Sequence, residues 1–69
     1  MKYYEFVVNK NGLMMGSFKR KADSQASAAG YIAKYPGQPV AIKAHVYSVP
    51  LDRYDVGDHY LYSYDVPIA

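Results

Sequence analysis

Two kinds of side chain that can do chemistry gather near the end of this sequence. Asp55, Asp58 and His59 lie close together, and His45 precedes them. Carboxylate oxygens and imidazole nitrogens can hold a divalent cation or act as general acid and base. The run Asp-Val-Gly-Asp is equally typical of a turn, because aspartate bonds its own backbone and glycine supplies positive φ. With no cysteine, no third histidine and no recognisable metal or phosphate motif, we predict no catalysis, metal or cofactor.

Tyrosine is the second conspicuous residue type. The chain has nine tyrosines, two phenylalanines and no tryptophan. A core alone would be served as well by phenylalanine, which has no hydroxyl to satisfy. Strand alternation predicts that Tyr60, Tyr62 and Tyr64 share one face. Two interpretations stay open: half-buried rings paired across strands, or an exposed aromatic patch that binds a partner.

The charges are distributed unevenly along the chain. Residues 1–48 hold seven Lys or Arg against two acidic residues, a net charge of +5, whereas residues 49–69 hold one Arg against four Asp, a net charge of −3. This polarity indicates either two contact surfaces of opposite sign or packing of the acidic end onto the basic body. A basic hairpin could also follow a phosphate backbone, although cations at a strand end are equally typical of a solvated edge. The four cations of that hairpin are Lys10, Lys19, Arg20 and Lys21.

The elements that must position these residues follow from periodicity and turn chemistry. Alternation predicts strands over residues 2–8, 13–21 and 39–49, and a last strand within 57–66 after a charged loop over 50–58. Asn11-Gly12 predicts a hairpin turn, and Gly16 indicates either a bulge or a close approach of another backbone. Residues 24–35 read as a helix capped by Asp23 or Ser24 and ended by Pro36-Gly37. In the third strand we expect Val40, Ile42, Ala44 and Val46 to point inward.

These elements predict an α+β fold with the order ββαββ. The expected architecture is a single small domain over residues 1–69, a four-stranded antiparallel sheet with one helix packed on one face. One thin helix cannot shield both faces of four strands, so the second face is either wet or covered by a partner. The start of the chain has the character of neither a signal peptide nor a membrane span, so we expect a soluble, cytoplasmic protein.

From these observations we expect a small non-catalytic protein-binding module. Its size and lack of catalytic groups suggest an inhibitor or adaptor of the type that phage or mobile elements encode, acting on a nucleic-acid-handling defence protein of the host. The alternative is a small nucleic-acid-binding domain that uses the basic hairpin, and a homodimer is compatible with both. The expected protein-binding residues are Tyr54, Asp55, Asp58, Tyr60, Tyr62, Tyr64 and Asp65.

Overall fold

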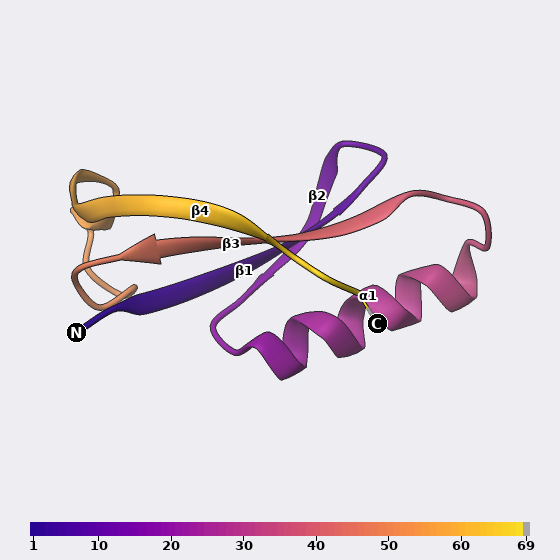
Figure 1. Ribbon diagram of the computed structural model, residues 1–69, viewed down its shortest axis with the longest axis horizontal. Coiled ribbons are helices and arrows are strands. Elements are labelled where there is room, and N and C mark those ends of the chain that lie inside the picture. The colour runs from indigo at the N-terminus through magenta and orange to yellow at the C-terminus, as the bar shows by residue number, and fades with distance from the viewer. Residues whose placement is uncertain (69) are drawn as a thin grey trace.

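A hairpin opens the fold. The computed structural model describes residues 1–68 and places strands β1 (Tyr3–Lys10) and β2 (Leu13–Phe18) side by side (Figure 1). Between them Asn11 has φ 52° and Gly12 has φ 82°. Two successive left-handed residues make the type I′ turn that matches the twist of the flanking strands. The hairpin predicted from Asn-Gly is confirmed.

The remaining elements complete one sheet with one helix. Helix α1 (Lys21–Lys34) leads to β3 (Val40–Tyr47), and a short 3₁₀ helix η1 (Val56–His59) precedes β4 (Tyr60–Val66). The strand order is β2-β1-β3-β4, and all neighbours are antiparallel. The α+β fold with the order ββαββ is therefore confirmed. In the described residues no helix is long and apolar enough to cross a membrane.

The ends of β2 and α1 differ from the predicted ones. β2 stops at Phe18 and α1 begins at Lys21, so the strand ends and the helix begins three residues earlier than expected. Ser24 lies inside the helix, fully buried, and its hydroxyl donates to the Lys21 carbonyl over 2.8 Å. Asp23 stands in the first turn, where its carboxylate pairs with Arg20. The predicted cap at Asp23 or Ser24 is wrong because both residues already belong to the helix.

The core lies between α1 and one half of the sheet. Ala28 of the helix packs against the sheet, and its small methyl side chain lets the helix approach the strands closely. The buried sheet residues of this cluster are Phe6, Val8, Ile42, Ala44 and Val66. Val46 is buried too, so the inward set predicted for β3 is confirmed, with Val40 partly buried at its edge.

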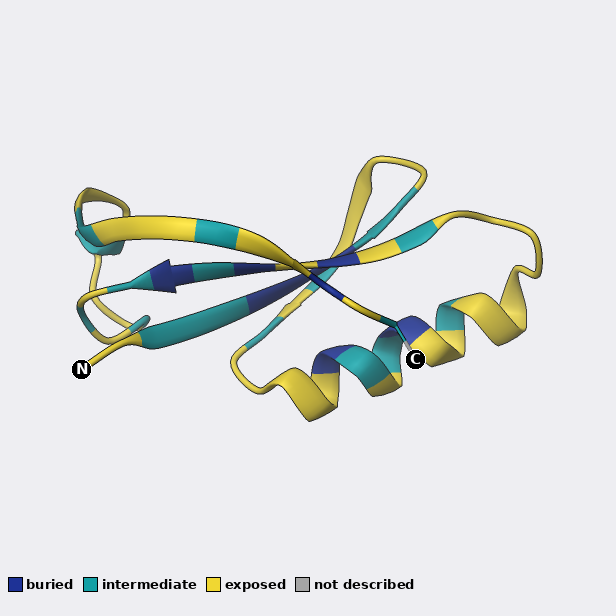
Figure 2. Cartoon of the chain, in the orientation of Figure 1, coloured by how far each residue is buried: buried dark blue, intermediate teal, exposed yellow. Residues whose placement is uncertain are grey.

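The helix is too short to cover the whole sheet. Its 14 residues span about 21 Å, whereas the longest dimension of the molecule is 37 Å. Figures 1 and 2 show the result: the beginning of β1, the end of β3 and the beginning of β4 extend beyond the N-terminal end of α1. One end of the helix-side face therefore has no helix over it.

A bulge in β4 overturns one expectation about the tyrosines. Val46 lies opposite Tyr62 and Tyr47 lies opposite Tyr60, which leaves Leu61 as an extra residue. The extra residue shifts the alternation, so Tyr60 turns to the face away from the helix. The prediction that Tyr60 shares a face with Tyr62 and Tyr64 is wrong.

Candidate protein-binding surface

Two cross-strand rows bring tyrosines together on the helix side of the sheet. Tyr4 lies opposite Val46, and Val46 lies opposite Tyr62. In the next row Tyr64 lies opposite Ala44. Directly opposed residues of antiparallel strands point to the same face, so all three rings lie on the helix side. We call Lys2, Tyr4, Tyr62 and Tyr64 the tyrosine face.

The rings of this face are partly exposed although they cover buried residues. Tyr62 and Tyr64 are 41% and 42% exposed, whereas Val46 and Ala44 beneath them are inaccessible to solvent. The centroids of the two β4 rings are 6.4 Å apart. Figure 2 shows the exposed residues of β4 running toward the end that lacks the helix. The rings therefore close the end of the core and also present an aromatic surface to solvent.

A cation belongs to the same surface. The Lys2 ammonium donates a hydrogen bond of 3.3 Å to the hydroxyl of Tyr62 and lies 5.2 Å from the centre of its ring. That hydrogen bond is the main reason that the pKa of Lys2 is raised above its ordinary value. The tyrosine face thus carries a positive charge at its edge.

Of the seven predicted binding residues, the structure brings only Tyr62 and Tyr64 together on the tyrosine face. Tyr60 packs on the far face, its ring centre 5.8 Å from that of Tyr47 and 6.1 Å from that of His45. Asp65 lies opposite Lys43, also on the far face. The other three, Tyr54, Asp55 and Asp58, lie in the β3–β4 connection, with the Tyr54 ring fully exposed.

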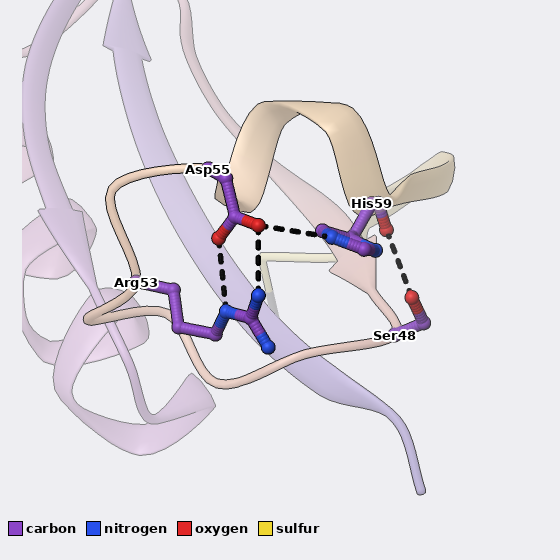
Figure 3. A network of polar contacts seen from close by, with 4 residues as sticks. All are labelled: Ser48, Arg53, Asp55 and His59. Carbon is purple, nitrogen blue, oxygen red and sulfur yellow. Dashed lines mark hydrogen bonds and ion pairs between the residues drawn. The ribbon is translucent and has the colours of Figure 1, made fainter.

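Asp55 is the centre of a polar network in this connection (Figure 3). Arg53 donates to its two carboxylate oxygens over 2.9 and 2.7 Å, and His59 Nε2 lies 3.3 Å from Oδ2. The hydrogen bonds from Arg53 are the largest of several causes that lower the pKa of Asp55. The backbone N–H of Ser48 also donates to the His59 carbonyl over 3.0 Å. The network holds the connection against the end of β3, so the Asp55 carboxylate is already paired.

The aspartates and histidines considered as metal ligands or catalytic groups do not gather at one site. Residues 1–68 contain no group of three His, Asp or Glu side chains with the spacing of metal ligands. Asp55 and His59 meet each other, while His45 packs against Tyr60 on the sheet. Their contacts are those of a loop and of a strand surface.

The cations of the alternative nucleic-acid site are also dispersed. Lys10 lies at the turn end of the β1–β2 hairpin, with its ammonium 3.3 Å from the centre of the Tyr35 ring. Lys19, Arg20 and Lys21 lie at the opposite end of β2, where Arg20 pairs with Asp23 over 3.0 Å. The four cations therefore form no continuous basic stripe.

The far face of the sheet mixes aromatic and polar side chains. Glu5 lies on this face, where Ser17 donates to the carboxylate over 2.8 Å and Tyr47 donates over 3.5 Å. Burial raises the pKa of Tyr47, and the negative charge of Glu5 raises it further. Lys43, Ser63 and Asp65 share this face with Tyr47 and Tyr60.

Lys2 and Tyr4 are the members of the tyrosine face that were absent from the predicted site. The alternation of β1 carries a signal for them, since Lys2 and Tyr4 are in phase with the inward-facing Phe6 and Val8. The alternation does not predict where α1 begins over the sheet. That position determines that Tyr4 remains beside the open surface.

Comparison with known proteins returns no relative: no family model, curated protein or solved structure matches the chain. The function is therefore argued from the surface alone.

Proposed function

We propose that the protein is a non-catalytic binding module that contacts another protein through its tyrosine face. One observation carries the proposal: Tyr62 and Tyr64 stay about two-fifths exposed on the helix side of β4, where Lys2 joins Tyr62 and Tyr4 lies across the sheet. The far face instead mixes its tyrosines with charged and polar side chains, among them Glu5, Lys43 and Asp65.

The chemistry of tyrosine supports a protein partner. Tyrosine is enriched at the energetic centres of protein interfaces, because a rigid ring offers a large contact area and a hydroxyl at little entropic cost. Lys2 adds an exposed charge at the rim of this surface. A charge in that position contributes more to the selectivity for a partner than to the affinity.

Two of the aspartates predicted to bind the partner do not contribute to the tyrosine face. Asp65 lies on the far face and Asp55 is paired with Arg53. Action on a host nucleic-acid-handling protein through carboxylates that imitate phosphates therefore stays a prediction. The identity of the captured partner will test it.

The experiment begins with capture from a nuclease-treated lysate at physiological salt. A captured protein is then purified, and its affinity is measured by calorimetry. We expect the double substitution Tyr62→Thr and Tyr64→Thr to weaken binding by at least about 30-fold, the loss typical of an interface centre. Threonine keeps the strand preference of these positions.

The matched control is Tyr60→Thr. Tyr60 lies on the same strand and is 47% exposed, but it faces the other side of the sheet. We expect its substitution to leave the affinity within about twofold. Loss of binding in the Tyr60 variant alone, with both face substitutions tolerated, would assign the interface to the far face.

A further inference from the structure

One part of β1 has no neighbour on one side. β3 pairs with β1 along its whole length, from Tyr3 to Lys10, whereas β2 pairs with it only from Phe6 onward. No backbone hydrogen bond from a turn or loop within residues 1–68 reaches the segment 3–5. Because backbone groups of a strand point alternately to its two sides, this segment presents free donor and acceptor groups along its outer edge.

A groove follows this open edge. Its volume is about 470 Å³, within the range of sites that hold ligands. Tyr3 and Tyr4 both line it, although successive residues of a strand point to opposite faces. A cavity that borders both residues lies at the edge of the sheet and not on one face. The complete lining is Lys2, Tyr3, Tyr4, Phe6, Lys19, Pro50, Leu51 and Asp52.

The two ends of the groove are formed by different segments. Lys19 comes from the connection between β2 and α1, and Pro50 to Asp52 come from the loop that follows β3. Between them the lining residues of β1 run from Lys2 to Phe6, about 13 Å of extended chain. The groove therefore accommodates about four residues of an extended peptide.

The Lys19 end of the groove favours a carboxylate. The groove contains two lysines and one aspartate, Asp52, which forms no ion pair within the described chain and belongs to the other end. Within the described chain Lys19 has no ion pair, while Lys2 turns its ammonium toward the tyrosine face. Asp23, the acidic residue nearest in sequence to Lys19, is paired with Arg20. An incoming carboxylate thus meets an uncommitted cation beside apolar walls.

We infer that this groove binds an extended, acidic peptide segment of the partner protein, which adds to β1 as a further strand along residues 3–5 and directs a carboxylate toward Lys19. In this mode backbone hydrogen bonds give affinity and pockets for alternate side chains give selectivity. The inference rests on the proposed function, since Lys2 and Tyr4 line the groove and also belong to the tyrosine face.

The probe is a phage-displayed library of random linear 12-residue peptides, selected on the immobilised protein. We expect the recovered peptides to share an Asp or Glu among alternating apolar residues. A synthetic copy of one should bind Lys19→Glu at least tenfold more weakly than the wild-type protein. It should also slow hydrogen exchange of at least one amide among residues 3–5, as measured by NMR.

The matched control is Lys34→Glu, which makes the same charge change in the last turn of α1, away from the groove. No enrichment, basic or helical consensus peptides, or equal weakening by the two charge reversals would each overturn the inference. So would a concentration-dependent dimer that buries residues 3–5 and excludes the peptide.

The two proposals fail separately. If the captured partner requires Tyr62 and Tyr64 but binds Lys19→Glu normally, the tyrosine face stands and the edge-binding mode is wrong. If acidic peptides occupy the edge while the double threonine variant keeps its full affinity for the partner, the proposed function is wrong.

Discussion

Deletion of Leu61 tests the bulge that separates Tyr60 from the tyrosine face. Leu61 is the residue of β4 without an opposite partner, between Tyr62 opposite Val46 and Tyr60 opposite Tyr47. Its removal joins two stretches that are already paired with β3. We therefore expect the shortened chain to fold with a continuous β3–β4 ladder and with Tyr60 still against Tyr47.

The expected change in stability is small because two effects oppose each other. Leu61 is 47% exposed, and full burial of a leucine contributes roughly 1.5–3 kcal/mol, so its loss costs about 1 kcal/mol. A regular ladder regains a backbone hydrogen bond, worth about 1 kcal/mol. The two nearly cancel, and we expect the free energy of unfolding to change by less than about 1 kcal/mol. In a domain of this size that corresponds to less than about 4–8 °C in Tm.

The assay is thermal unfolding followed by circular dichroism, with NMR contacts between the Tyr60 and Tyr47 rings as the structural readout. Leu61→Thr, which keeps the extra residue, serves as the control. If β4 had no bulge, deletion of Leu61 would move Tyr60, the strand residue before it, to the opposite face of the sheet. A fall in Tm of more than about 15 °C, or loss of the Tyr60–Tyr47 contacts, would therefore refute the bulge.

Two further predictions concern the turns. Gly12→Ala should lower the free energy of unfolding by about 1–2 kcal/mol in urea titrations, because Gly12 has φ 82° and open space around it, so the cost is that of the left-handed backbone; an unchanged urea midpoint would contradict the type I′ turn. The lowered pKa of Asp55 means that its contribution to stability is present above its unfolded pKa, near 4, and is lost as pH falls through the lower folded value. Asp55→Asn should therefore be less stable than wild type at pH 6 and should approach it at the lowest pH; a constant difference down to pH 2 would show that Arg53 does not stabilise the carboxylate.

Much of the fold could be predicted because its signals are local. Asn11-Gly12 specifies the turn by backbone conformation, and the alternation of Ile42 and Ala44 places β3 in the core. The helix start was missed because Ser24 is typical of a cap in sequence but lies inside α1. In the structure its buried hydroxyl donates a hydrogen bond to the carbonyl of Lys21.

The site could be predicted only in part, because its limits are set by tertiary structure. Tyr62 and Tyr64 were identified by their alternation, which holds wherever the ladder is regular. Tyr60 was misplaced because nothing in the sequence of β4 marks Leu61 as an extra residue. Tyr4 was missed because its exposure depends on where α1 ends over the sheet.

The order of charged residues along the chain does not reveal which of them form ion pairs in the structure. The basic and acidic halves of the chain suggest two surfaces of opposite sign, yet the acidic half partly neutralises itself, since Asp55 binds Arg53 and His59. Lys19 has no ion pair in the described chain and lies beside the open edge of β1. The charges available to a partner are thus those of the side chains that form no ion pair with their neighbours. On that ground Lys19, at one end of the groove, predicts a carboxylate on the partner segment.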